Sequence, residues 1–331
     1  MGRRLAGPAG QPRAPAQRAF FCALQVVHSP HCKGENSRRG DRTRPQSTSQ
    51  HYSPHGTCVR PTSEEDRLSD HALGSTTRPY NQLTFAEACQ RIAAAGYSDV
   101  AVFAHNREMP VDSGSSADEV AATRQAAADS GLDPSMLLGR THLELGLEAA
   151  TDDYKRLIDN AAALGCRWIL ELGTGKEEHY GDYPRLMSAV ADHAQTAGIG
   201  ISLKPHGGIS LTARELIDLH DQIDHPAFRI SYDPGNIIYY TKGAVRPEDE
   251  VEQIASRTST LIIKDCTLDG DKADVMVTAG DGLVDFSFAI GTLRAGGFRG
   301  PMYVECVGST EPDEVDADLK RTHAYIAALI P

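Results

Sequence analysis

Five apolar runs of this chain each end in a charged residue, and this pattern limits the folds open to it. The runs end at Glu171, Lys204, Asp233, Lys264 and Glu305, at intervals of 33, 29, 31 and 41 residues. Such intervals fit one strand plus one crossover helix, and a parallel strand buried on both faces has a short, continuous apolar sequence. Repeated βα units with a polar side chain at the C-terminal end of each strand are typical of barrel active sites. The pattern therefore predicts an enzyme.

The charge distribution divides the chain near residue 68. Residues 1–67 contain 11 Lys and Arg against 5 Asp and Glu, with many Pro, Ser, Gly and His and little apolar periodicity. We expect this basic leader to be disordered or an over-extended start. A targeting segment is the alternative, because Ala19 to Val27 is apolar and follows several arginines.

Residues 68–331 contain 22 Lys and Arg against 40 Asp and Glu. An acidic body repels phosphate backbones, so we expect a small carbohydrate rather than a nucleic acid as the partner. No apolar run approaches the roughly 18 residues that span a bilayer, so no membrane association is expected. The seven cysteines include no C-x-x-C pair, which favours reduced thiols and a cytoplasmic location. The sequence leaves a homo-oligomer open.

Eight alternations of strand and helix predict a (β/α)8 barrel over residues 68–331. Glycines that follow five of the helices fit left-handed C-caps. An open doubly wound sheet is the alternative, but the first strand is not followed by G-x-G-x-x-G. The predicted strands are 71–76, 99–104, 135–140, 167–172, 200–204, 228–232, 261–264 and 301–304, and the predicted helices are 85–95, 117–130, 151–164, 183–197, 212–223, 247–257, 286–295 and 313–329.

Three strand-end carboxylates and one imidazole are candidates for a divalent-metal site. Glu171, Asp233 and Glu305 would meet His206 at the barrel mouth, since His206 follows Lys204 by two residues. Oxygen ligands with one nitrogen suit Mn²⁺, Mg²⁺, Co²⁺ or Zn²⁺. The alternative is that each of these side chains bonds a loop amide.

Further polar residues at strand ends are candidates for catalysis or substrate binding. Lys204 and Lys264 follow long apolar runs, and desolvation there would favour proton transfer, whereas the alternative is ion pairing with the carboxylates. His105, His142 and Asn236 are expected substrate contacts, although a histidine in such a place is commonly just a hydrogen-bonded structural residue.

The motifs KPHGG, SYDPGN, IIKD, GDGLVDF, GGFRGP and YVE, in this order, resemble the xylose-isomerase-like TIM-barrel superfamily of sugar phosphate isomerases and epimerases. The resemblance spans about residues 71–330 and implies a metal set of Glu, Asp, His and Glu after the fifth to eighth strands. Asp233 and Glu305 match this set, but Lys204 and Ile262 stand where the first Glu and the His are usual. A bound metal would therefore require Glu171 and His206 as replacement ligands.

The resemblance implies an isomerase or epimerase that moves a proton next to a carbonyl through an enediolate. Lys204 and Glu171 are then the candidate bases, and Lys264 or the metal would stabilise the enediolate. A metal-free lyase or aldolase would instead use Lys204 or Lys264 as a Schiff-base nucleophile. The residues also leave open a sugar-binding barrel without turnover and a repair enzyme similar to endonuclease IV.

Overall fold

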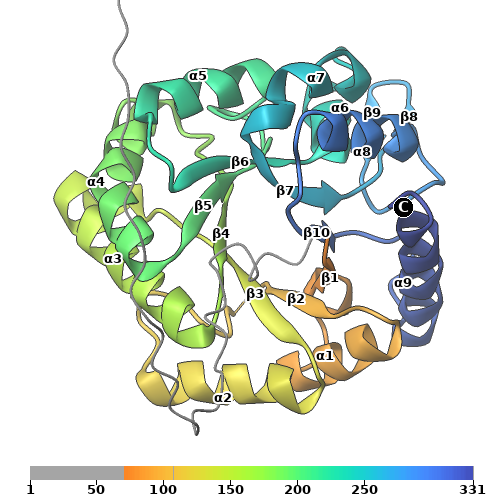
Figure 1. Cartoon of the computed structure of the whole chain (residues 1–331), viewed down its shortest axis with the longest axis horizontal. Coiled ribbons are helices and arrows are strands. Elements are labelled where there is room, and N and C mark those ends of the chain that lie inside the picture. Colours follow the sequence, from red (N-terminus) through yellow and green to blue (C-terminus); the bar gives the residue numbers. More distant parts are fainter. Residues whose placement is uncertain (1–70, 107, 331) are drawn as a thin grey trace, which may run out of the picture. The chain divides into compact units, whose positions relative to one another are not determined.

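The computed structural model describes residues 71–106 and 108–330. Within these residues, eight parallel strands close into a barrel in the order β1-β10-β7-β6-β5-β4-β3-β2, and helices surround it (Figure 1). The predicted (β/α)8 barrel is thus confirmed. The expectations for the leader, residues 1–67, lie outside the described residues. No helix of the described part has both the length and the apolar character needed to cross a membrane.

The strands lie close to their predicted positions, apart from one additional hairpin. A short antiparallel pair, β8 and β9, follows β7 and was not predicted. The strands are β1 (Leu73–Thr76), β2 (Asp99–Val102), β3 (Asp133–Leu138), β4 (Trp168–Glu171), β5 (Gly200–Leu203), β6 (Phe228–Tyr232), β7 (Thr258–Ile263), β8 (Thr267–Asp269), β9 (Lys272–Asp274) and β10 (Met302–Val304).

Most helices also match their predicted ranges, with two differences. Asp233 caps a helix that was not predicted, α6, and Pro234 occupies its first turn. The predicted helix 247–257 is divided into η5, α7 and η6. The helices are α1 (Phe85–Ala94), α2 (Ala117–Asp129), α3 (Leu147–Leu164), α4 (Asp182–Ala197), α5 (Ala213–Ile223), α6 (Pro234–Thr241), α7 (Val251–Ile254), α8 (Phe286–Ala295) and α9 (Pro312–Ala327), with 3-10 turns η2 (Arg78–Tyr80), η3 (Leu143–Leu145), η4 (Glu177–His179), η5 (Pro247–Asp249) and η6 (Ala255–Arg257).

Local sequence signals define several helix ends. Capping boxes begin α1 and α2, where a Ser or Thr side chain and a Glu three residues later bond each other's backbone N–H groups. At the start of α5, the Glu215 carboxylate accepts hydrogen bonds from the backbone N–H and the hydroxyl of Thr212. Gly165 and Gly198 end α3 and α4 with φ values of 100° and 72°. These positive angles confirm the predicted glycine C-caps, since a Cβ atom would be strained there.

Alternation along the strands sorts the apolar side chains into two layers. One layer packs between the strands and the helices, and it contains Ile169, Leu203, Tyr232 and Ile263. The second layer fills the barrel interior. Because successive side chains of a strand point to opposite faces, this division fixes which strand-end residues face the barrel axis. The interior layer consists of Ala101, Phe103, Met136, Leu170, Ile262 and Tyr303, with Leu138 and Trp168 packed against it.

Candidate functional site

Four of the strand-end charged residues face the barrel axis at its C-terminal mouth. Lys204, Asp233, Lys264 and Glu305 each follow, by one position, an outward-facing residue that ends β5, β6, β7 or β10. Alternation therefore turns these four side chains inward. All four are nearly inaccessible, with exposed fractions of 1%, 0%, 2% and 3%.

The four side chains form one ion cluster. Nζ of Lys204 lies 3.1 Å from Oδ2 of Asp233 and 2.5 Å from Oε2 of Glu305. Nζ of Lys264 lies 2.7 Å from Oε1 of Glu305 and 3.3 Å from Oδ2 of Asp233. Each ammonium group thus contacts both carboxylates, which compensates the cost of burying all four charges.

Arg78 and Asn236 extend the ion cluster in two directions. Nη1 of Arg78 lies 2.8 Å from Oε1 of Glu305, and 38% of the Arg78 side chain is exposed. Asn236 accepts a hydrogen bond from Nζ of Lys264 at 3.1 Å and donates one to the carbonyl of Pro205 at 2.7 Å. With Arg78, the ion cluster holds three cations and two carboxylates, a formal charge of +1.

The environment of the ion cluster shifts the pKa values of its members. Burial alone would raise the pKa of Glu305, but Lys204, Lys264 and Arg78 hold it well below its usual range. Burial alone would lower the pKa of Lys264, but Asp233 and Glu305 raise it above its ordinary value. Lys264 is therefore protonated at neutral pH, which argues against the expected Schiff-base chemistry at this residue.

His206 lies beside the ion cluster as a neutral imidazole. Burial, followed by the charges of Lys204 and Lys264, lowers its pKa to about 4. Its ring centroid is 5.2 Å from that of Tyr240 on α6. At neutral pH this side chain is therefore uncharged.

Glu171 is not brought to the ion cluster. It follows the inward Leu170 on β4, so its carboxylate points outward between the barrel and the helices. Its Oε1 accepts a hydrogen bond of 2.7 Å from Tyr154 on α3, and its Oε2 accepts one of 3.5 Å from Tyr183 on α4. The expected role of Glu171 as base or metal ligand finds no geometric support.

The two predicted substrate-contact histidines bond neighbouring parts of the chain. Nδ1 of His105 is 3.0 Å from the carbonyl of Leu83, and its ring lies edge-on to Phe85. Nδ1 of His142 is 3.1 Å from Oε1 of Glu144, and the backbone of His142 is left-handed. Neither histidine contacts a member of the ion cluster.

The side chains of the mouth do not fit a divalent cation. The two ammonium groups lie against the Asp233 and Glu305 oxygens that a metal would need, and the inward position of β7 carries the apolar Ile262. Throughout residues 71–106 and 108–330, no group of three or more His, Cys, Asp or Glu side chains is placed to hold a metal ion. The expected set of Glu171, His206, Asp233 and Glu305 is not assembled.

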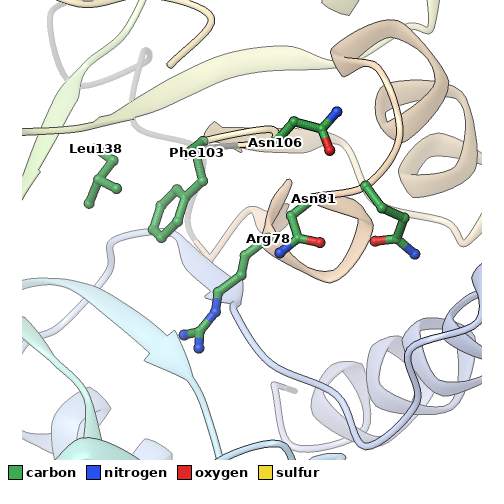
Figure 2. Close-up of a pocket in the computed structure, with 7 residues that line it drawn as sticks. Arg78, Asn81, Phe103, Asn106 and Leu138 are labelled. Carbon is green, nitrogen blue, oxygen red and sulfur yellow. The ribbon is translucent and has the colours of Figure 1, made fainter. Parts of the chain in front are cut away.

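Two pockets lie over the mouth, and the residue that joins them was not predicted from the sequence. Arg78 lines both, as do Asn81 and Gln82; the cavity volumes are about 430 Å³ and 300 Å³. In Figure 2, Phe103 and Leu138 lie on one side of the larger pocket, Asn81 and Asn106 lie on the opposite side, and the Arg78 guanidinium extends away from Asn81. Arg78 follows a short strand by two residues, outside the apolar runs. The sequence signal that could have identified Arg78 is its position two residues after β1, because the C-terminal ends of the strands form the mouth.

Asp265 of the IIKD motif holds a loop near the mouth. Its Oδ2 accepts hydrogen bonds of 2.9 Å from the backbone N–H groups of Gly280 and Gly282, and its Oδ1 accepts one of 3.0 Å from Val284. The IIKD and GDGLVDF motifs are therefore linked by a structural contact.

The Glu171 carboxyl predicts a dependence of stability on pH. Burial raises its pKa from 4.5 to about 7, although Tyr154 and Tyr183 partly oppose the shift. Between these values the folded state holds a proton that the unfolded chain has lost, so stability falls as pH rises. Above pH 7, ionisation of the buried Glu171 carboxyl lowers the free energy of unfolding by about 3 kcal/mol, at about 1.4 kcal/mol per pKa unit.

Glu171→Gln should therefore flatten the fall of unfolding free energy between pH 5 and 8, measured by urea denaturation. Glu148→Gln, at an exposed position of α3, is the matched control and should keep the slope of the parent. Parallel profiles for parent and Glu171→Gln would contradict the pKa shift.

A comparison with protein families identifies the barrel. The family described as xylose isomerase-like TIM barrel matches residues 89–325. The chain belongs to this family. The match covers most of the barrel, including Lys204, Asp233, Lys264 and Glu305, whereas Arg78 lies before it. No curated protein matches the chain.

Solved structures show the same fold at low sequence identity. A xylose isomerase domain protein from Planctomyces limnophilus has 19% identity and a TM-score of 0.62, with 79% of this chain and 97% of that chain covered. A xylose isomerase-like TIM barrel protein from Mycobacterium smegmatis, in complex with magnesium, has 17% identity and a TM-score of 0.64, covering 79% and 98%. D-Psicose 3-epimerase from Clostridium cellulolyticum H10, with D-tagatose, has 13% identity and a TM-score of 0.64, covering 78% and 99%.

Proposed function

We propose that this protein is an isomerase or epimerase of a small carbohydrate, and that a pair of lysines supplies the positive charge that a metal would otherwise provide. The observation that carries the proposal is the convergence of Lys204 and Lys264 on Asp233 and Glu305. Family membership and the fold shared with a D-psicose 3-epimerase support the substrate class and the reaction type.

The reaction moves one proton. A base takes a proton from the carbon next to a carbonyl, the electron pair moves onto the carbonyl oxygen to give an enediolate, and a proton returns to the same or the neighbouring carbon. The negative charge on oxygen is the unstable feature of this intermediate. The ion cluster, whose formal charge is +1 and whose lysines and carboxylates are buried, lowers the energy of such a charge.

We assign the proton transfer to His206 rather than to the lysines or Glu171. A base must be unprotonated at neutral pH and must reach the mouth. His206 is unprotonated at neutral pH, since burial and the charges of Lys204 and Lys264 lower its pKa to about 4, although an imidazole of such low pKa is a weaker base than one whose pKa is near 7. Glu171 lies outside the barrel, and Lys264 is protonated.

A carbohydrate-binding barrel without turnover is the second candidate. The favouring observation is that Lys204 and Lys264 are only 1% and 2% exposed and donate their hydrogen bonds to Asp233, Glu305 and Asn236. Such lysines act on a substrate through their charge and not through contact. A barrel of this kind would bind a sugar and leave its C–H bonds intact.

Deuterium exchange separates the two candidates. The full chain is incubated in D₂O with a panel of ketoses, aldoses and their acid and phosphate derivatives, and NMR follows exchange at the carbon next to the carbonyl. We expect exchange and isomerisation of one class, equally fast with EDTA and with added Mn²⁺. Tight binding without exchange for every member of the panel would favour the binding barrel, and activity that depends on Mn²⁺ would contradict the lysine pair.

Lys204→Met tests the role of the lysine pair. The substitution leaves two cations for two carboxylates, so the fold should persist, while turnover should fall about a hundredfold, the usual size of a lost electrostatic contribution. Lys320→Met, at an exposed position of α9, is the matched control and should behave as the parent. Equal rates for the two variants would remove the lysine pair from the mechanism.

The cysteines support the proposed cytoplasmic location. Cys89, Cys166, Cys266 and Cys306 are free and buried. Reduced thiols of this kind are typical of a reducing compartment.

A further inference from the structure

The exposed side of the ion cluster is a single arginine. Lys204, Lys264, Asp233 and Glu305 are at most 3% exposed, whereas the Arg78 side chain is 38% exposed. Arg78 lines both pockets over the mouth. A ligand in these pockets therefore meets the charge of the ion cluster first at the Arg78 guanidinium.

Only part of the guanidinium is engaged within the protein. Nη1 of Arg78 bonds Oε1 of Glu305 at 2.8 Å. Among the described residues, no further hydrogen-bond acceptor contacts the side chain of Arg78. The planar guanidinium carries five N–H donors in a fork that matches the oxygens of a carboxylate or a phosphate.

The charge of the mouth contrasts with that of the whole chain. The chain carries a formal charge of −12, but the ion cluster carries two carboxylates against three cations. The positive mouth attracts anions, whereas the acidic remainder of the protein repels them. Because Arg78 is partly buried, this attraction is screened less than at an open surface.

The neighbours of Arg78 suit the uncharged part of a sugar derivative. Asn81 and Gln82 line both pockets and offer amide groups to hydroxyls. Phe103 and Leu138 give the larger pocket an apolar side for C–H groups (Figure 2). The volumes of about 430 Å³ and 300 Å³ lie within or close to the range of small-ligand sites.

We propose that Arg78 binds an anionic group, a carboxylate or a phosphate, of the ligand that occupies the two pockets over the mouth. This inference rests on the proposed function for its sugar, but the anion site itself is tested by binding and not by turnover. A carboxylate and a phosphate share the chemistry that Arg78 recognises, and the experiment distinguishes them.

The test is isothermal titration calorimetry of the full chain with matched pairs of probes. D-Fructose 6-phosphate is compared with D-fructose, and D-gluconate with D-glucitol. We expect the anion of at least one pair to bind at least tenfold more tightly than its neutral partner, with an affinity that falls as NaCl is raised. The pair with the larger ratio identifies phosphate or carboxylate as the group that is bound.

Arg78→Met should lower the affinity for the preferred anion about tenfold to hundredfold, the usual value of hydrogen bonds to a charged group, and should leave the neutral partner within twofold. Arg78→Lys keeps the positive charge but lacks the forked N–H donors, so its affinity for the anion should fall less than that of Arg78→Met. Arg214→Met, on α5 with the Arg214 side chain 83% exposed, is the matched control and should bind as the parent.

Two results would overturn the anion site. Either anions bind no better than their neutral partners, including the case in which no probe binds, or Arg78→Met and Arg214→Met bind the anion equally well. The proposed function fails by a different result. Anion binding through Arg78 without deuterium exchange would support the anion site and contradict the isomerase. Rapid exchange with neutral sugars alone would support the isomerase and contradict the anion site.

Discussion

Glu305→Gln is expected to lower the free energy of unfolding by about 3–5 kcal/mol and to abolish turnover, because it leaves buried cations without their main partner. Glu305 contacts Lys204, Lys264 and Arg78 at 2.5, 2.7 and 2.8 Å. Without its charge, the three cations face Asp233 alone. Urea denaturation measures the loss, and the melting temperature should fall by about 10 °C.

A compensating double variant controls for this effect. Lys264→Met/Glu305→Met removes one cation together with the carboxylate, so the formal charge of the ion cluster stays at +1. Replacing a buried ion pair by apolar groups of similar volume is often neutral for stability. We expect the double variant to regain most of the lost free energy without regaining turnover. Equal losses in the single and double variants would show that charge balance does not stabilise the mouth.

The stability that the Glu305 charge contributes should be lost at low pH. The pKa of Glu305 is held well below 4.5 in the folded state, so its contribution is complete above the unfolded value and disappears as pH falls through the folded value. The difference between parent and Glu305→Gln should therefore be constant from pH 8 to 5 and should shrink only below about pH 4.5. A difference that already shrinks near pH 6 would contradict the lowered pKa.

Lys204→Glu/Ile262→His is expected to create a divalent-metal site that the parent lacks. The two substitutions place a carboxylate after β5, at the position where Lys204 contacts Asp233 and Glu305, and an imidazole on the inward face of β7, two residues before Lys264. The formal charge of the mouth changes from +1 to −1, which favours a cation. Carboxylates with one imidazole suit Mn²⁺. Elemental analysis of the full chain after incubation with Mn²⁺ should find about one equivalent in the double variant and none in the parent.

Two controls locate such a metal site. Lys204→Gln/Ile262→His removes the lysine without adding a ligand and should bind far less Mn²⁺. Glu171→Gln, introduced into the metal-binding double variant, should leave the Mn²⁺ content unchanged, because Glu171 bonds Tyr154 and Tyr183 outside the barrel. One equivalent of Mn²⁺ in the parent, lost in Asp233→Ala, would show that Lys204 and Lys264 do not exclude a metal.

The helices and strands were largely predictable because their signals are local. Apolar runs and glycine C-caps depend on neighbouring residues. The predicted ranges agree closely with α1, α2 and α5, and the predicted glycine C-caps agree at α3 and α4. The helix α6 was not predicted because SYDPGN has the composition of a turn, although Asp233 and Pro234 form a helix start. The resemblance to the family also rested on short motifs in order, and the family match confirms it.

The sequence by itself determined the barrel, the family and the mouth at which the charged residues meet. It did not determine which of them face one another, and only the tertiary structure decided that. The strands of a closed parallel barrel are apolar on both faces, so their sequences do not show which face is inward. Barrel closure turned Lys204, Asp233, Lys264 and Glu305 to the axis and Glu171 to the helices. It also brought Arg78, 227 residues away in sequence, into contact with Glu305.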